Sequence, residues 1–256
     1  MPVSATTRRA GLVLTPVERH GGHWVKRDDL ADERGVRGGK ARTLGVICRH
    51  ITATGARGLT IHAARNSVTP ATLGAVCAAY GVSSCVHTAA AAGPLPEPYQ
   101  EAIGRGTRVC EHRPGYMSVL AARARDQAAA DGYLAVGLGL DFPPATTETA
   151  RQAANLPRDV RRLVTAVGSG HMLEGILRGM VTIGLTIPVL GVCVGKLPEC
   201  IVNMETPLSV ELVKINDDFH RPAKVTALGE LELNPYYEAK CIPYMQEGDL
   251  LWVVAK

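Results

Sequence analysis

The sequence predicts an α/β fold built on parallel β-sheets, and three observations support this prediction. Its 256 residues suit one large α/β domain or two small ones. Only two Phe and two Trp are present, so the core must come from Ala, Val, Leu and Ile, which suits buried parallel strands covered by Ala-rich helices. Short apolar runs also alternate with helical segments along most of the chain, as βα units do.

The N-terminal part of the chain is expected to be mostly irregular. Its first thirty residues contain one short strand, at 23–25. A glycine-rich turn at 35–39 then opens a helix over 40–54, since glycine punctuates regular elements.

The middle of the chain repeats strand–helix pairs. The strands are expected at 59–62, 84–87, 107–111 and 133–137, and the helices at 70–80, 98–103, 118–130 and 147–154. Right-handed crossovers would place the functional loops at the carboxyl ends of these parallel strands. We expect a smaller lobe of about residues 60–140, inserted in a larger lobe formed by 1–59 and 141–256.

The C-terminal part continues the same alternation. An apolar strand at 163–167 leads into the turn Gly168-Ser169-Gly170 and a helix that ends near residue 182. Further strands are expected at 188–194, 210–215 and 250–254, with a helix over 235–245. Asn234-Pro235 marks the start of that helix, because proline is favoured in the first turn.

Composition limits the possible functions. The net charge of +4, with eleven basic and five acidic residues among the first sixty, is too small to indicate nucleic-acid binding by itself. Seven scattered cysteines without a C-x-x-C pair argue against a disulfide framework and a zinc site, so we expect a reducing, cytoplasmic compartment and no metal. No secretory signal or membrane span is expected, because the most apolar stretch, 172–195, is interrupted by charged residues and a proline.

Lys40 is the first residue of chemical interest. It stands at a predicted helix start, where the positive end of the helix dipole favours the neutral amine. A neutral, partly desolvated amine is the form that Schiff-base chemistry needs. A surface lysine after a glycine turn is the ordinary alternative.

The turn at 168–170 is the second such feature. Backbone N–H groups after an apolar strand, together with a helix N-terminus, form a phosphate cradle, and a plain tight connection is the alternative. The sequence is neither a P-loop nor a complete G-x-G-x-x-G motif.

The third feature is Tyr237-Glu238, expected in the first turn of the last helix, where core packing and helix capping are the ordinary alternatives.

Together these segments resemble the fold type II pyridoxal-phosphate enzymes, the tryptophan synthase β-like group. The similarity is greatest to the branch of aminocyclopropane-carboxylate deaminase and D-cysteine desulfhydrase. The matching segments are Lys26-Arg27-Asp28-Asp29, Gly38-Gly39-Lys40-Ala41-Arg42, Gly168-Ser169-Gly170-His171-Met172 and Asn234-Pro235-Tyr236-Tyr237-Glu238-Ala239-Lys240. The asparagine that precedes the lysine in this branch is missing, and His171-Met172 replaces its Gly-Thr. The resemblance implies a three-layer arrangement of open parallel sheets, here a compact variant with a reduced small lobe.

The resemblance also implies a cofactor and roles for individual residues. Lys40 would hold pyridoxal 5'-phosphate as an aldimine and then act as catalytic base, beside a catalytic Tyr237. Glu238 would face the pyridine nitrogen, and Asn66 the ring hydroxyl. The phosphate would bind to the segment Gly168, Ser169, Gly170, His171 and Met172. Arg65, Ser67 and Thr69 could hold a substrate anion, with a turn and a helix N-cap as the alternative.

Three functional hypotheses remain open from the sequence. The first is a lyase, deaminase, β-eliminase or decarboxylase that acts on a free amino acid through an α-carbanion; family members are usually homodimers. The second is an enzyme of phage type that modifies an amino acid attached to a nucleotide or a DNA base. The third is a binding protein that kept the fold but lost the chemistry, as the altered phosphate loop and short C-terminal end suggest.

Overall fold

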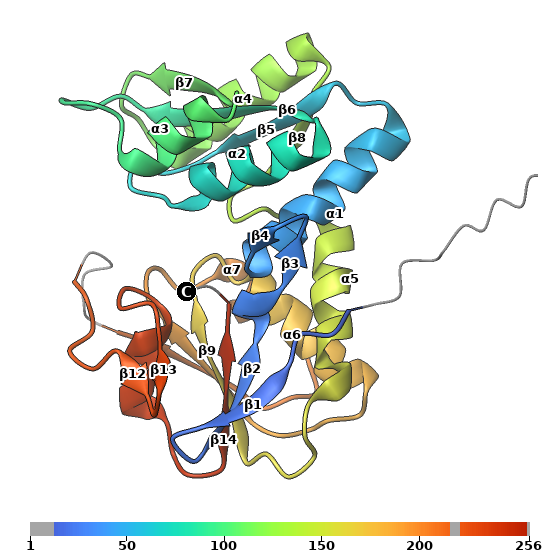
Figure 1. Ribbon diagram of the computed structural model, residues 1–256, viewed down its shortest axis with the longest axis vertical. Helices are drawn as coiled ribbons and strands as arrows, with labels where there is room; N and C mark the ends of the chain where they lie inside the picture. The colour runs from blue at the N-terminus through green and yellow to red at the C-terminus, as the bar shows by residue number, and fades with distance from the viewer. Residues whose placement is uncertain (1–12, 216–220, 255–256) are drawn as a thin grey trace, which may run out of the picture.

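The computed structural model describes residues 13–215 and 221–254, and these residues form two main β-sheets with helices packed around them (Figure 1). The large sheet has the strand order β1-β2-β14-β9-β10-β11. Its strands are β1 Val17–His20, β2 His23–Arg27, β14 Asp249–Val253, β9 Arg162–Val167, β10 Val189–Cys193 and β11 Val210–Lys214. All neighbours pair in parallel except the β1–β2 hairpin at one edge.

The small sheet has the order β7-β6-β5-β8, and all its pairs are parallel. Its strands are β5 Gly58–His62, β6 Ser83–Ala89, β7 Arg108–His112 and β8 Leu134–Val136. The α-helices are α1 Gly39–Thr54, α2 Thr69–Tyr80, α3 Glu97–Gly104, α4 Met117–Asp131, α5 Pro143–Arg151, α6 His171–Thr182 and α7 Glu199–Val202. The expected α/β class with parallel sheets is therefore confirmed.

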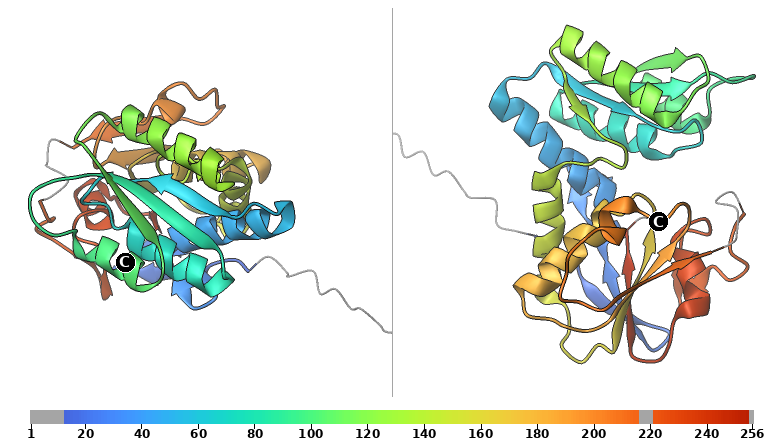
Figure 2. Two further views of the ribbon diagram at one scale, coloured as in Figure 1. Left: turned by 90° about the horizontal axis from the view of Figure 1, so that it is seen from above. Right: turned by 180° about the vertical axis from the view of Figure 1, so that it is seen from behind.

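Helices cover the sheets because the strands are apolar on both faces of the large sheet and on one face of the small sheet. One core cluster joins α6 to one face of the large sheet, through residues such as Leu173, Ile176 and Trp252. A second cluster fills the opposite face with Val164, Leu251 and the segment around Cys241. The third joins the small sheet to α1, α2 and α3. Figure 2 shows α1 running between the two sheets.

Several elements differ from the expectations. From residue 13 on, the N-terminal part is more regular than expected, because a hairpin joins β1 to β2 through Gly21 and Gly22, which both have positive φ; the expectation for residues 1–12 lies outside the described residues. Two more short antiparallel pairs were not foreseen: β3 Asp32–Glu33 with β4 Val36–Arg37, and β12 Ala227–Leu228 with β13 Leu231–Glu232. A short 3-10 helix, η1 Asp28–Leu30, directly follows β2.

Two expected helices are also corrected. The helix expected at 147–154 begins earlier, as α5, and ends in the 3-10 turn η2 Gln152–Asn155. The helix expected at 235–245 is the shorter 3-10 helix η3 Glu238–Tyr244, which contains Pro243. Proline has no N–H to donate, so it does not continue an α-helical hydrogen-bond ladder. Asn234 instead forms a turn, in which its side-chain oxygen accepts a hydrogen bond from the Tyr236 N–H at 3.0 Å.

Within the described residues, no helix has both the length and the apolar character that crossing a bilayer requires.

Candidate active site

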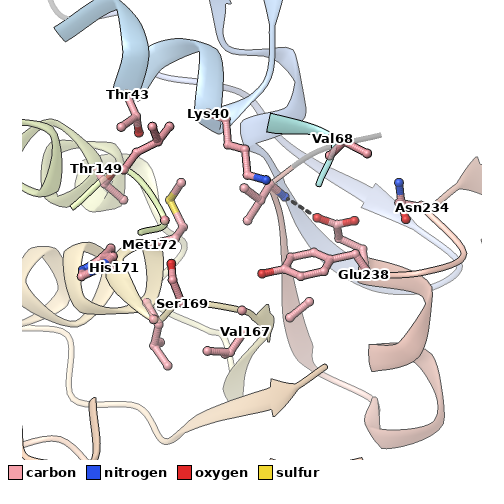
Figure 3. Close-up of a pocket in the computed structure, with 18 of the residues that line it drawn as sticks. Lys40, Thr43, Val68, Thr149, Val167, Ser169, His171, Met172, Asn234 and Glu238 are labelled. Atoms are coloured by element: carbon pink, nitrogen blue, oxygen red, sulfur yellow. Dashed lines mark hydrogen bonds between the residues drawn. The ribbon is translucent and has the colours of Figure 1, made fainter. Parts of the chain in front are cut away.

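A cavity of about 450 Å³ lies between the two sheets, at the carboxyl ends of β5, β9 and β14. This is the edge at which parallel strands present their functional loops. Figure 3 shows part of its lining. The lining includes Lys40, Thr43, Asn66, Val68, Thr146, Thr149, the segment 166–173, Asn234, Tyr236, Tyr237, Glu238 and Val254. Segments far apart in sequence therefore meet around one hollow.

Lys40 is the second residue of α1, as the glycine turn before it predicted. Gly38 has a φ of 111°, and the Gly39 N–H donates a 2.9 Å hydrogen bond to the carbonyl of Val254, next to β14. The Lys40 amine donates to the hydroxyl of Thr69 at 3.1 Å. Burial lowers the pKa of Lys40, and the nearby Glu238 charge partly opposes this effect. A larger share of this amine is therefore neutral at pH 7 than for a surface lysine.

A buried ion pair fixes the start of α1. Arg42, one turn after the glycines, forms a two-pronged contact with Asp28, and its Nη2 lies 2.8 Å from Asp28 Oδ2. The same Nη2 donates to Thr149 of α5 at 3.3 Å and lies 3.9 Å from the sulfur of Met172. The segments 26–29 and 38–42, which the sequence singled out, thus meet through Asp28 and Arg42. This pair connects α1 to both η1 and the cavity wall.

The turn Gly168-Ser169-Gly170 leads from β9 into α6, whose first residue is His171. Gly170 has a φ of 95°, and a Cβ added there would lie 2.6 Å from the sulfur of Cys200. A Cβ on Gly168 would lie 2.8 Å from the Tyr237 hydroxyl. No side chain caps this helix N-terminus, so its backbone N–H groups and positive dipole end face the cavity edge.

Glu238 lies across the cavity from α6 (Figure 3), and Tyr237, which precedes it, also lines the cavity. Glu238 is fully buried, and its Oε1 accepts a 3.2 Å hydrogen bond from the Val254 N–H. Burial raises the pKa of the Tyr237 hydroxyl, and the Glu238 charge adds to this shift. Tyr237 therefore keeps its proton at neutral pH and can act as a donor.

In the segment 64–69, Asn66 and Val68 line the small-sheet side of the cavity, whereas Arg65, Ser67 and Thr69 do not line it. Ser67 accepts a 3.2 Å hydrogen bond from the Thr69 N–H, and Thr69 accepts the one from Lys40. Arg65 points elsewhere: it forms a 2.6 Å ion pair with Glu111 and donates to the carbonyls of residues 93 and 94.

His171 lies at the cavity with two carboxylates near its ring. Its Nδ1 is 3.7 Å from Asp141 Oδ1 and 3.7 Å from Glu174 Oε2. Sequence reasoning did not single out Thr43, Thr149 or Val254, which also line the cavity. None belongs to a motif of chemical residues; the position of Val254 just after the last strand was the one available signal.

The fold agrees with known enzyme structures over nearly the whole chain. A crystal structure of an ACC deaminase homologue matches with a TM-score of 0.79 and 18% sequence identity, covering 95% of this chain and 89% of that one. A pyridoxal 5'-phosphate-dependent aspartate racemase matches with a TM-score of 0.68 at 16% identity, covering 94% and 89%. Serine racemase from Dictyostelium discoideum matches with a TM-score of 0.65 at 14% identity, covering 94% and 91%.

No protein-family model and no curated protein matches the sequence. The structural matches nevertheless confirm the expected architecture, because several enzymes with one fold match over the same span. The chain has the fold of the fold type II pyridoxal-phosphate enzymes.

Proposed function

We propose that this protein is a pyridoxal-phosphate-dependent enzyme that acts on an amino acid as a lyase or deaminase. The observation that supports this most directly is the meeting, around one cavity, of a buried lysine amine, a buried carboxylate and an uncapped helix N-terminus. These three groups are chemically matched to an aldehyde, a protonated ring nitrogen and a phosphate.

The residues present suit the cofactor on structural grounds. Lys40 has the lowered pKa that attack on an aldehyde requires. The glycines at 168 and 170 let the turn before α6 pack closely against its neighbours, since a Cβ at either position would collide with a neighbouring side chain. Ser169 and the backbone of His171 and Met172 would complete the phosphate site. Asn66 is our candidate partner for the ring hydroxyl.

Bound pyridoxal phosphate would supply an electron sink that stabilises negative charge at the α-carbon of an amino acid. Glu238 would hold a proton at the pyridine nitrogen, since a buried carboxylate favours a neighbouring positive charge. Lys40, once free, would accept or return a proton at the α-carbon, while Thr69 orients its amine. Tyr237 would donate a proton to a leaving group or to the substrate.

The substrate carboxylate would lie against the segment 65–69. Thr69 accepts a hydrogen bond from the Lys40 amine, and Ser67 accepts one from the Thr69 N–H, which supports a role for this turn near Lys40. Arg65 would have to leave Glu111 to reach the cavity, so its participation implies a rearrangement of this turn on substrate binding. Homodimer formation and a cytoplasmic location remain predictions.

Covalent labelling tests the proposal. The protein is mixed with pyridoxal phosphate, reduced with borohydride and mapped by peptide mass spectrometry. We expect one adduct, at Lys40. The absorbance band of the bound cofactor should be absent in Lys40→Ala. Because burial lowers the pKa of Lys40, labelling should reach its plateau at a lower pH than labelling of a surface lysine with a pKa of about 10.4.

Lys26 serves as an internal control in the same experiment. It is fully buried, and burial lowers its pKa to about 8, but it hydrogen-bonds to Thr15 and Asn155 and does not line the cavity. Labelling of Lys26 in place of Lys40, or no labelling of a folded protein, would contradict the proposal. Amino acids, nucleosides and DNA can then be screened by the change that each causes in the absorbance band.

A further inference from the structure

The small sheet has two chemically different faces. Its inner face, towards α1, α2 and α3, is apolar and includes Leu59, Ile61 and Val86. On the other face, which α4 covers (Figure 1), many of the alternate residues of the strands are polar or contain sulfur. On the two neighbouring strands β6 and β7 they include Arg108 and also Cys85, His87, Cys110 and His112; these last four are here called the Cys–His face.

This face arises from a short repeat in the sequence. Cys85-Val86-His87 lies on β6 and Cys110-Glu111-His112 on β7. Residues two apart in a strand point to the same face, so each repeat contributes one thiol and one imidazole to it. The parallel register places His87 directly beside Cys110. All four side chains therefore lie on one face of the sheet, which α4 covers over β6 and leaves more open at the edge strand β7.

The donor atoms are close enough to share one ion. Cys85 Sγ and Cys110 Sγ are 3.5 Å apart, and a ring nitrogen of His87 lies within 4.8 Å of both sulfurs. Two sulfurs bound to one tetrahedral zinc ion at about 2.3 Å would be separated by about 3.8 Å. The observed sulfur separation is thus near the value that zinc requires, and longer than the roughly 2.05 Å of a disulfide bond.

His87 itself needs a partner for one nitrogen. The side chain is 1% exposed, and its Nε2 is buried with no hydrogen-bond partner within the described part of the chain. Its Nδ1 lies 2.8 Å from His112 Nε2, and the two rings are stacked. Leaving a buried ring nitrogen unsatisfied is costly, and a bound metal ion would remove that cost.

The surroundings accommodate a cation. Arg108, which lies beside Cys85, is neutralised by an ion pair with Asp131. The buried residues of α4 include Ala124 and Ala128, which have small side chains. Cys110 and His112 are only partly buried on the edge strand β7, which gives an ion access from solvent.

We propose that Cys85, His87 and Cys110 bind a thiophilic divalent metal ion, with zinc as the best match. Two thiolates and an imidazole are the ligands that zinc prefers, and water can take the fourth position. His112 holds the ring of His87 through their hydrogen bond. Binding converts both thiols to thiolates and releases their two protons to solvent. The site is independent of the cofactor proposed for the cavity.

Cobalt substitution tests the site directly. The reduced full-length protein, without pyridoxal phosphate, is titrated with Co²⁺ and then with Zn²⁺ in competition with a chromophoric chelator. We expect one equivalent to bind, with thiolate-to-cobalt charge-transfer bands that zinc abolishes. Cys110→Ser should weaken zinc binding by more than tenfold, and His112→Ala by about 10- to 100-fold with the bands retained.

Two cysteine variants serve as controls. Cys48 and Cys77 are a second close pair, with sulfurs 3.9 Å apart, so Cys77→Ser should leave the bands unchanged. Cys200 lies with His171 and Glu174 in another group of possible ligands beside the cavity, so Cys200→Ser should also leave them unchanged. Absence of thiolate bands in the reduced wild type, bands that survive Cys110→Ser, or bands lost with Cys200→Ser would each overturn the proposal.

A labelling measurement keeps the test decisive if Cys110→Ser fails to fold. Zinc should protect Cys110, which is only partly buried, from alkylation in the wild-type protein, and peptide mass spectrometry reports this cysteine separately from the others. Equal alkylation of Cys110 with and without zinc would show that it does not bind the metal.

Discussion

The two walls of the cavity are built differently. The wall on the large-sheet side contains the start of α1, the turn 168–170 and Glu238, and it is supported by buried contacts such as the Asp28–Arg42 pair. The wall on the small-sheet side is the turn 64–68, in which Asn66 is exposed and Val68 is 62% exposed. One wall is therefore part of the protein core, whereas the other is a surface turn.

This difference suggests a division of labour. A cofactor that stays bound is best held by groups whose positions are fixed before it arrives. A substrate that enters and leaves needs a wall that can change position, and half-exposed turns are the segments that open at least cost. We therefore expect substitutions in the large-sheet wall to damage both stability and cofactor binding, and those in the small-sheet wall to have much smaller effects on both.

The largest effect is expected from Asp28→Asn. This change leaves the buried Arg42 guanidinium without its countercharge, which costs about 3–5 kcal/mol of unfolding free energy. Because Arg42 also contacts Thr149 and Met172, cofactor labelling at Lys40 should fall as well. Urea denaturation and borohydride labelling measure the two effects.

The double variant Asp28→Leu with Arg42→Met is the matched control. Removing both charges should recover much of the lost stability, since an apolar pair of similar volume can replace a buried ion pair. Labelling at Lys40 should stay low, because the contact between residues 28 and 42 then no longer holds the start of α1 to η1 and Thr149. If Asp28→Asn alone cost less than about 1 kcal/mol, as exposed ion pairs do, the large-sheet wall would not be the rigid one.

A smaller loss is expected from Gly170→Ala. The new methyl group would meet Cys200 Sγ at 2.6 Å and Pro198 Cβ at 2.7 Å, in a residue with a φ of 95°. We expect a loss of about 1–3 kcal/mol and at least tenfold weaker binding of pyridoxal phosphate. Denaturation and a titration of the cofactor absorbance measure these quantities.

Gly184→Ala separates the backbone effect from the collision. Gly184 lies two residues after the end of α6 and has a φ of 65°, and nothing lies within 4 Å of an added Cβ. It should lose about 1 kcal/mol of stability, from its left-handed backbone alone, and keep full affinity for the cofactor. Equal loss of affinity in both variants would mean that the turn 168–170 is not the phosphate site.

The sequence predicted the large-sheet wall well because its elements are locally encoded. A glycine turn before Lys40, an apolar strand before Gly168 and the Asn-Pro pair before Glu238 each mark a boundary that depends on neighbours in the chain. The structure places all three around one cavity. The helix type after Tyr237 was missed, since an internal proline and the packing of η3 on the large sheet decide it.

The Cys–His face escaped sequence reasoning for the opposite reason. Its two repeats lie 25 residues apart, and neither alone differs from an ordinary strand. Strand register joins them, and register depends on how β6 and β7 pair. The lack of a C-x-x-C pair speaks only against a metal site with locally spaced ligands, whereas a site built across two strands has no fixed spacing in the chain.

The smallest effect is expected from Arg65→Ala in the small-sheet wall. Arg65 pairs with Glu111, which is 39% exposed, so solvent weakens the pair and its loss should cost about 0–1 kcal/mol. Cofactor labelling at Lys40 should not change, because Arg65 does not line the cavity. Denaturation and labelling of Arg65→Ala and Glu111→Gln, side by side, provide the measurement.

If Arg65 leaves Glu111 to bind the substrate carboxylate, Arg65→Ala alone should weaken the spectral response to amino acids, and Glu111→Gln should strengthen it by releasing the guanidinium. Equal responses in both variants would restrict Arg65 to a structural role, and a loss of labelling in either would show that the two walls act as one.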